Sequence, residues 1–564
     1  MIHPVGGQAV RKTNMALFGE LKRRHVIRVL VAYAIAGWVA VEVADVMFPR
    51  LGLPEWAVNA ITWSYVGGFL PVAILAWIFK WTPEGLKRDL GLAGPQAPER
   101  SIAVLPFANM SADVEQEYFA DGLAEELLNL LARVPDLQVA ARTSAFAFKG
   151  KDMPVREIAQ ALHVAQVLEG SVRKSGDQVR ITAQLIHASD GYHMWSETWD
   201  RTLEDIFAVQ DEIAHAVLKK LKMDIAPAEK PTTRPMDTEA YNLVLLGRYL
   251  VEQRTRPSVK KAIAALSQAV KLAPDHADGW TMLARAIWQE ASGGWIHGAQ
   301  HREAMRASRE ALDRALSADP DSPEAYEFLG WLTWSYDWDW STADHAIRRS
   351  LQVKPDNPRA LNTAACLALT LGRLDESLEI FGRALGLDPL NTPVLNNLAL
   401  AYLYADRFDE AESAIKRAIA ILPDAAVHRY ILGRIYLAMG DLVKARRAFE
   451  DEVDEEARES GEVLLLTAEG HPDKADQMLD KMMVLDATPA LDIASVYAMS
   501  GDADQAFQWL ELAREQRDGN LCDIRHLPEF RNLHSDSRWN DFLGTIGLSD
   551  HQIADLALKP FPLD

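Results

Sequence analysis

The sequence predicts a mainly α-helical protein built from a two-helix transmembrane hairpin, a small α/β domain with a mixed sheet, and an α-α superhelix of repeated helix pairs. Two long apolar runs lie near the amino terminus, short strand-like runs follow, and Pro355, Pro389 and Pro423 recur every 34 residues. With 564 residues, the chain is long enough for several domains. The expected boundaries are 1–28 for a basic amino-terminal segment, 29–79 for two transmembrane helices, 80–100 for a linker, 101–222 for the α/β domain, 223–235 for a linker, 236–520 for about eight repeat units and 521–564 for a carboxy-terminal cap.

The membrane hairpin is predicted from two apolar runs. Trp56 to Phe79 carries no formal charge over 24 residues, enough to cross a hydrocarbon core of about 30 Å. Val29 to Phe48 is the second run, with Glu42 and Asp45 towards its far end. Basic residues gather outside the two runs, and only Arg50 lies between them. We therefore expect a two-helix protein of the bacterial inner membrane, with everything after the second helix in the cytoplasm.

Small residues on the first run suggest close packing. Ala32, Ala36, Ala40 and Ala44 recur every four residues and would form one smooth stripe on a helix. The stripe fits packing inside the hairpin, and the alternative is a homodimer formed through the membrane helices. The lipid bilayer is therefore an expected contact, and a second copy of the chain is the less favoured alternative partner of the stripe.

The α/β domain is predicted from a change of periodicity. Short apolar runs at 102–107 and 137–141 indicate buried strands, and amphipathic stretches at 121–133, 155–162 and 203–221 indicate helices. Residues 164–173 and 179–187 flank Ser175, Gly176 and Asp177, which is typical of a hairpin. Apolar and polar residues alternate in the second of these strands, so we expect one buried face and one solvated face.

Charged residues in this domain allow two interpretations. Asp121 and Glu125 lie four apart on one helix face, as in a metal or proton-transfer site, but solvated helix charges are the commoner explanation. Arg142, Thr143 and Ser144 follow a strand and fit either an anion site or a capped turn. The sequence contains no glycine-rich phosphate loop, zinc-ligand spacing or nucleophile elbow. We therefore predict no enzyme activity, no catalytic residue, no cofactor and no metal.

The repeats are predicted from residue types that return at fixed positions. Small residues let two antiparallel helices approach closely, large apolar residues fill the space between units, and proline stops the second helix. A single helix pair cannot bury its apolar face, so the units must stack. The positions that carry the pattern are Trp280, Gly330, Pro355, Phe381, Pro389, Tyr402, Ala411, Pro423, Gly433, Tyr436 and Ala445.

This pattern over 236–520 resembles tetratricopeptide repeats, and the match of type and spacing is specific. The resemblance implies a right-handed superhelix whose concave face binds peptides or partner proteins. After the last unit, Leu533, Trp539, Phe542 and Leu543 have helical spacing, which predicts a terminal cap.

The α/β region also resembles a known domain. Its phrases are Ser101 to Phe107, Tyr118 to Leu127, Ala141 to Ser144 and Gly191 to Trp195. They resemble the TolB amino-terminal-like domain of bacterial signalling proteins, in which a class III adenylate cyclase or a winged-helix domain stands ahead of it. Residues 1–28 are too few for either domain, so the chain resembles the regulatory part of repeat-containing adenylate cyclases without the cyclase.

An aromatic cluster is the candidate partner-binding site. Trp331, Trp334, Trp338 and Trp340 lie within ten residues and could anchor a partner in a groove. The alternative, which we favour, is that they fill the core of an atypical repeat. Cys366 and Cys522 are the two cysteines of the chain, and their separation argues against a disulfide framework.

Charge limits the class of partner. The formal net charge is -21, and about -18 of it falls after residue 230. An acidic array repels nucleic-acid phosphates, so a protein or peptide, possibly a basic one, is the expected partner. The sequence thus predicts a membrane-anchored scaffold or adaptor in signalling or assembly. The alternative is a sensory receptor whose α/β domain binds a small ligand and signals through the repeats.

Overall fold

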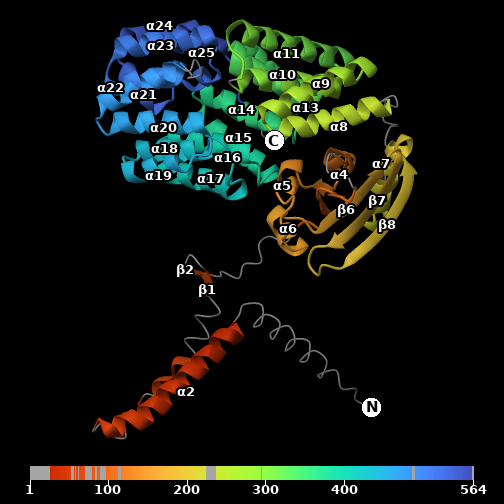
Figure 1. The fold of residues 1–564 in the computed structure, drawn as a ribbon, viewed down its shortest axis with the longest axis vertical. Coiled ribbons are helices and arrows are strands. Elements are labelled where there is room, and N and C mark those ends of the chain that lie inside the picture. Colours follow the sequence, from red (N-terminus) through yellow and green to blue (C-terminus); the bar gives the residue numbers. More distant parts are fainter. Residues whose placement is uncertain are drawn as a thin grey trace. The chain divides into compact units, whose positions relative to one another are not determined.

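The computed structural model describes residues 26–51, parts of 56–69, 79–82, 85–88 and 97–561, with short gaps at 112, 114–115, 224–236, 294 and 485–489. The chain divides into two compact units, Met1–Gln96 and Ala97–Asp564 (Figure 1). Each unit is described by itself below. The expected basic segment before residue 26 and the stretch 70–78 of the second apolar run lie outside the described residues.

In the first unit, helix α2 (Val26–Arg50) is followed by two short antiparallel strands, β1 (Phe79–Thr82) and β2 (Gly85–Arg88). The Tyr33 hydroxyl donates to the Tyr65 carbonyl at 3.1 Å, so α2 contacts the second run. No helix in the described part of the chain combines the length and the apolar character that a bilayer crossing requires. The predicted transmembrane hairpin over 29–79 is therefore wrong, and so is the inner-membrane placement that depended on it.

Two features of these residues explain the error. Helix α2 includes Glu42 and Asp45, both exposed, and carries Arg50 in its last turn. The second run does not continue as a helix to its expected end, because Phe79 begins a strand. An apolar run read from sequence alone therefore overstated the length of uninterrupted apolar helix. The predicted contacts with a bilayer, and a dimer through membrane helices, have no support in the described residues.

The second unit begins with the predicted small mixed sheet, ordered β5-β3-β6-β7-β8, with β4 also paired to β6. Strand β3 runs parallel to β5 and β6, whereas β6, β7 and β8 are antiparallel neighbours. The predicted hairpin is confirmed, because Ser175 pairs with Gln178 at its tip. The elements are β3 (Ser101–Val104), β4 (Ala108–Asn109), α4 (Glu117–Ala132), β5 (Gln138–Val139), α5 (Arg142–Phe146), α6 (Val155–Leu162), β6 (Gln166–Ser175), β7 (Gln178–His187), β8 (His193–Thr202), η2 (Leu203–Asp205) and α7 (Ile206–Lys220).

Two layers of helix cover this sheet unequally. Helices α4 and α7 cover one face, where Leu123 and Val209 are buried with Ile181 of β7. Helices α5 and α6 cover the other face only over β3 and β6, where Ile158 packs with Val167. Polar side chains face solvent over β7 and β8 on that side, as the alternation predicted.

Helices α8 to α23 form consecutive antiparallel pairs, each packed on the next. Figure 1 shows this stack from yellow-green to blue. Within it, a single π turn, η3 (Thr333–Asp337), interrupts the third pair. The helices are α8 (Thr238–Glu252), α9 (Arg256–Leu272), α10 (Ala277–Ser292), α11 (Gly298–Ala318), α12 (Pro323–Leu332), α13 (Trp340–Val353), α14 (Pro358–Thr370), α15 (Leu374–Leu387), α16 (Thr392–Tyr404), α17 (Phe408–Ile421), α18 (His428–Ala438), α19 (Leu442–Glu450), α20 (Glu455–Ala468), α21 (Pro472–Val484), α22 (Ala490–Ser500) and α23 (Ala503–Gln516).

Glycines set the close approach within several pairs. A Cβ at Gly433 would lie 2.3 Å from the Phe449 ring, and one at Gly330 would lie 2.6 Å from Ile347. Each glycine is on the first helix of its pair and each large side chain is on the second, so the pair closes only without a side chain there. The residue before each repeating proline ends a helix: Lys354, Asp388 and Leu422 are the caps before Pro355, Pro389 and Pro423.

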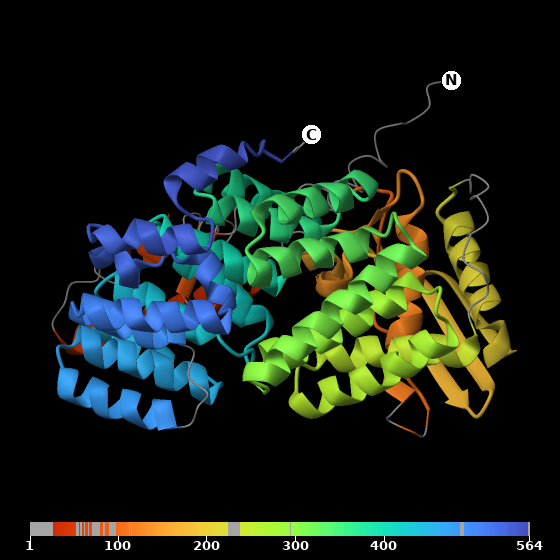
Figure 2. The same cartoon turned by 90° about the horizontal axis from the view of Figure 1, so that it is seen from above.

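The chain does not end with the last pair. Two 3₁₀ turns, η4 (Gly519–Asp523) and η5 (Pro528–Leu533), precede α24 (Ser537–Thr545) and α25 (Asp550–Leu556). The Trp340 indole donates to the Gly547 carbonyl at 3.1 Å, so this region returns to the middle of the array. Figure 2 shows its blue ribbon beside the green helices. Within the cap predicted over 521–564, α24 and α25 are α-helices, whereas η4 and η5 are 3₁₀ turns.

Candidate partner-binding surface

The first helices of the pairs form one continuous surface. Successive first helices, from α8 and α10 through to α20 and α22, pack on one another, whereas each second helix packs mainly on its partner and on the first helix of the next pair. In a curved stack of helix pairs, the helices that pack directly on their counterparts in the next pair form the concave side. We call this surface, formed by α8, α10, α12, α14, α16, α18, α20 and α22, the inner face.

The predicted aromatic cluster lies at the third pair and is mostly buried. Trp334, Trp338 and Trp340 are 6%, 9% and 3% exposed, and Trp331 is half-buried. The Trp334 indole donates to the Thr370 hydroxyl at 2.9 Å. The Arg517 guanidinium lies 4.8 Å from the centre of the Trp338 ring. The tryptophans therefore join α12 and α14 to the carboxy-terminal region, and little of three of them is left for an external partner.

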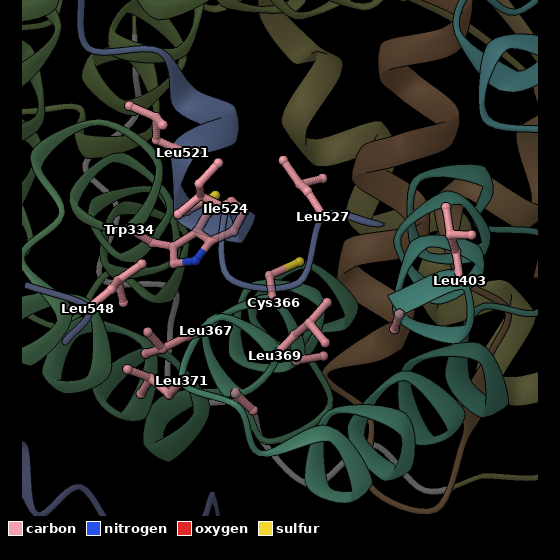
Figure 3. Close-up of a cluster of buried hydrophobic side chains, with 14 of the residues drawn as sticks. Trp334, Cys366, Leu367, Leu369, Leu371, Leu403, Leu521, Ile524, Leu527 and Leu548 are labelled. Carbon is pink, nitrogen blue, oxygen red and sulfur yellow. The ribbon is translucent and has the colours of Figure 1, made fainter. Parts of the chain in front are cut away.

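A segment that the sequence interpretation had not connected to the repeats covers part of the inner face. Residues 518–533, here called the return segment, follow α23 and run along α14, α16, α18 and α22. Figure 3 shows its apolar side chains over Cys366 and Leu369 of α14. A signal was present in the sequence: one apolar residue recurs every third position, which is the period of a 3₁₀ helix. These residues, all buried, are Leu521, Ile524, Leu527, Phe530 and Leu533.

Polar contacts fix the return segment as well. Glu529 accepts two hydrogen bonds from Arg434 of α18, both at 2.9 Å, and the two side chains are 11% and 12% exposed. His526 stacks on Tyr404 at the end of α16, with ring centres 6.3 Å apart. Arg531 pairs with Asp406 at 2.6 Å in the turn after α16. The segment is therefore held by the same helices that form the inner face.

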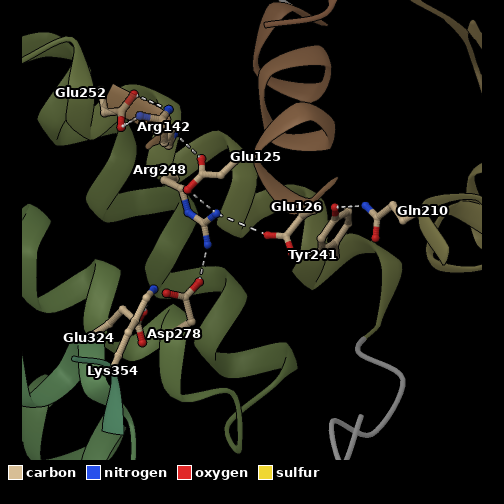
Figure 4. A network of polar contacts seen from close by, with 10 residues as sticks. All are labelled: Glu125, Glu126, Arg142, Gln210, Tyr241, Arg248, Glu252, Asp278, Glu324 and Lys354. Carbon is tan, nitrogen blue, oxygen red and sulfur yellow. Dashed lines mark hydrogen bonds and ion pairs between the residues drawn. The ribbon is translucent and has the colours of Figure 1, made fainter. Parts of the chain in front are cut away.

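The amino-terminal end of the inner face meets the α/β domain through a network of charges (Figure 4). Arg248 of α8 lies at its centre. Its guanidinium contacts Glu125 at 2.9 Å and Glu126 at 3.3 Å on α4, and Asp278 at 2.5 Å on α10. Burial opposes the charge of Arg248, but these carboxylates outweigh it and hold the pKa of Arg248 well above its ordinary value. A single cation therefore ties three helices together.

Arg142 adds a second bridge across this junction. It contacts Glu125 at 2.8 Å within the α/β domain and Glu252 at the end of α8, where its second bond is 2.7 Å. Burial raises the pKa of Glu125, but Arg248 and Arg142 overcome this and leave the pKa below its ordinary value. Glu125 is therefore an ion-pair partner, and Arg142 is occupied by carboxylates rather than by an external anion.

Ser144 reaches a different part of the array. Its hydroxyl donates to the Asp388 carboxylate and accepts from the Leu390 backbone N–H at 2.9 Å, in the connection between α15 and α16. Helix α5 therefore contacts the array at two places far apart in sequence. Asp121, the other candidate carboxylate, pairs with Lys149 at 2.5 Å. The cavity between α4, α5 and α8 measures only about 10 Å³, room for about one water molecule.

The repeat positions occupy the places expected from their size. Phe381, Ala411 and Ala445 are fully buried between helices. Tyr436 is buried and donates to Glu412 at 2.8 Å, whereas Tyr402 lies under the Arg407 guanidinium at 4.6 Å. The Trp280 indole donates to the Pro274 carbonyl at 2.8 Å, closing the turn before its own helix. These residues maintain the array and are not arranged around a reacting group.

Comparisons with known proteins agree with the repeats. Residues 368–430 match the family model described as tetratricopeptide repeat. Residues 98–216 match the model described as "HilA/YgeH-like transcriptional regulator, second domain". The resemblance to a TolB-like domain over the same region stays a prediction.

A protein of Rhizobium meliloti (strain 1021) named "Putative adenylate cyclase 3" is 35% identical over 268 residues, which are 46% of this chain and 45% of that protein. The chain thus spans less than half the length of the curated relative it matches. Similarity to solved structures is weaker. A human IFIT1 monomeric mutant with m7Gppp-AAAA shares 15% identity over 56% of this chain and 79% of its own, with a TM-score of 0.38.

Pseudomonas aeruginosa pilF shares 18% identity over 41% of this chain and 98% of its own, with a TM-score of 0.29. The protein YrrB, titled a TPR protein with an unusual peptide-binding site, shares 17% sequence identity over 37% of this chain and 92% of its own, with a TM-score of 0.23. We draw no functional argument from these structures. The helix pairs and the match over residues 368–430 show that the chain contains tetratricopeptide repeats, and it is similar over 268 residues to the protein named "Putative adenylate cyclase 3".

Proposed function

We propose that the protein is a scaffold or adaptor that holds a protein or peptide partner on its repeat array, in a signalling or assembly role. The supporting observation is the continuous inner face of first helices, to which the α/β domain is joined by buried ion pairs. Repeat arrays of this kind are typical of non-enzymatic scaffolds.

The charge of the array favours a basic partner. About -18 of the formal charge lies after residue 230, and oppositely charged surfaces raise the rate of encounter. Exposed carboxylates gather on α20 and α21: Glu455, Glu456, Glu462, Asp473, Asp476 and Asp480. A partner held by such charges would dissociate more readily as ionic strength rises.

The test is recovery of a partner by the full chain. Full-length protein with a carboxy-terminal tag is purified from its native cells without crosslinking, at a series of salt concentrations, and the co-purified proteins are identified by mass spectrometry. We expect one or a few basic proteins in constant ratio to the chain, and their recovery to fall between 50 and 300 mM salt, by about tenfold or more. The matched control is a tagged full-length chain carrying Gly433→Leu, which should disrupt pair packing. Recovery of the same proteins with that variant, or of none with either chain, would contradict the proposal.

A further inference from the structure

The return segment lies on the surface that the proposed function assigns to a partner. The return segment contacts the first helices α14, α16, α18 and α22, the turn after α16 and the π turn η3. It does not continue the helix-pair pattern, because η4 and η5 are 3₁₀ turns joined by irregular chain. An irregular segment laid across several helices has the form of a bound peptide rather than of another repeat.

Its side chains divide into anchors and one charged contact. The apolar residues at every third position are buried in the core of the array, and Ile524 and Leu527 lie near Cys366 (Figure 3). Glu529 supplies the carboxylate for Arg434, with two parallel bonds that fix both position and direction. Apolar anchors around one paired carboxylate define a chemistry that another polypeptide could reproduce.

The contact also contains polar groups that are poorly matched. Among the described residues, Asp523 Oδ1 and His526 Nε2 are buried without a hydrogen-bond partner. Nearby, the Ser335 hydroxyl of η3 and the indole nitrogen of Trp338, the residue after η3, are also buried without a hydrogen-bond partner. Each such group lowers the stability of the contact, because its hydrogen bonds to water are lost and not replaced. The return segment therefore combines buried apolar anchors with buried polar groups that its contacts leave unpaired.

We propose that the return segment is an internal ligand of the inner face, and that a partner polypeptide carrying regularly spaced apolar residues and a carboxylate for Arg434 exchanges with it. This rests on the proposed function, because it names the surface and the chemistry through which the array takes its partner. Bound to its own chain, the segment competes at an effective concentration of the order of millimolar. The array is then closed to weak partners until the segment is released.

The two cysteines give a test on the unmodified full chain. Cys366 and Cys522 are free thiols buried on opposite sides of this contact. If the segment is released without unfolding of the array, both thiols react with a maleimide faster than the chain unfolds globally, and the rate depends weakly on urea. Labelling at the global unfolding rate, with the full urea dependence, would overturn the proposal.

A variant of the full chain and a synthetic peptide provide a second test of the internal-ligand proposal. In the full chain, Glu529→Gln removes the charge that holds Arg434, and Asp504→Asn is the control, because Asp504 forms an exposed pair with Arg538 outside the segment. A fluorescent peptide of residues 518–533 with Cys522→Ala should bind the Glu529→Gln chain at least about tenfold more tightly than wild type or control. The same peptide with Glu529→Gln should bind about tenfold more weakly.

The outcomes separate this inference from the proposed function. If the peptide binds but no partner is recovered from cells, the internal-ligand proposal is supported and the scaffold proposal is contradicted. If wild type and the Glu529→Gln chain recover a partner equally and the peptide does not bind, the scaffold proposal is supported and the internal-ligand proposal is overturned. If Glu529→Gln does not fold, the thiol measurement on wild type decides alone.

Discussion

The two ends of the inner face are covered by different chemistry. At the amino-terminal end, α4 and α5 of the α/β domain meet α8 and α10 through Arg248, Arg142 and their carboxylates. Towards the carboxy-terminal end, the return segment lies on α14 to α22 through apolar anchors and one charged pair. Charges fix direction and register, whereas apolar burial supplies stability without direction. The first contact therefore suits a fixed joint, and the second suits a contact whose occupant can change.

The aromatic cluster is expected to show the largest effect of a single change. Trp338→Ala removes a side chain that is 9% exposed and that supports Arg517, so we expect a loss of about 3–5 kcal/mol in the free energy of unfolding. Urea unfolding followed by far-UV circular dichroism measures it. Val443→Ala, at a side chain that is 82% exposed, is the control and should change stability by less than about 0.5 kcal/mol. A loss below about 1 kcal/mol for Trp338→Ala would favour a partner-binding role.

A buried carboxyl at the return segment makes its stability depend on pH. Burial raises the pKa of Asp523 to about 7 against an ordinary value of 3.8, and Arg434 and the Thr370 hydroxyl oppose this only in part. A raised acid binds a proton on folding, so its contribution is fully present below about pH 4 and is lost as pH rises through about 7. Asp523→Asn should remove this dependence.

The measurement is the free energy of unfolding of wild type and Asp523→Asn between pH 4 and 8. As pH rises across that range, the free energy of unfolding of the variant should increase relative to that of wild type by up to about 4 kcal/mol. This corresponds to about 1.4 kcal/mol for each unit by which the pKa is raised. The exposed Asp504→Asn variant should follow wild type at every pH. Parallel curves for wild type and Asp523→Asn would show that this carboxylate is solvated, and would weaken the contrast between the two ends.

The charged joint should fail when its central cation is removed. Arg248→Met keeps the length of the side chain but leaves Glu125, Glu126 and Asp278 without their shared partner, so we expect a loss of about 3 kcal/mol. Lys354→Met is the control, because its pair with Glu324 is 48% exposed on both sides and contributes at most about 1 kcal/mol. Equal effects from the two substitutions, measured by urea unfolding, would mean that the joint is no stronger than a surface pair.

Local pattern was enough to predict the elements but not their distant contacts. The spacing of Pro355, Pro389 and Pro423 and the small residues at positions such as Gly433 depend on one helix pair, so the sequence carries them directly. The hairpin tip at Gly176 is local in the same way. The pairing of Arg434 with Glu529 joins residues 95 positions apart, which no periodicity encodes.

The incorrect predictions have a related cause. The length of the apolar runs and the flanking basic residues predicted a membrane hairpin, although Glu42 and Asp45 lie within the helix that forms. Asp121 and Glu125 were expected to be solvated, but Lys149, Arg142 and Arg248 reach them from other elements. The three-residue period from Leu521 to Leu533 is that of a 3₁₀ helix, which neither α-helical nor strand periodicity predicts.

The smallest predicted effect tests whether the charged end is held at more than one place. Ser144→Ala removes the hydroxyl shared by Asp388 and the Leu390 N–H without changing any ion pair of Arg248, so we expect a loss of about 1–2 kcal/mol. Ser189→Ala, which removes an exposed hydroxyl 2.9 Å from His187 Nδ1, should have almost no effect. Hydrogen exchange of α5 distinguishes the two arrangements. Faster exchange confined to α5 means that the α/β domain needs both contacts to stay fixed on the array, whereas unchanged exchange means that the Arg248 network holds it alone.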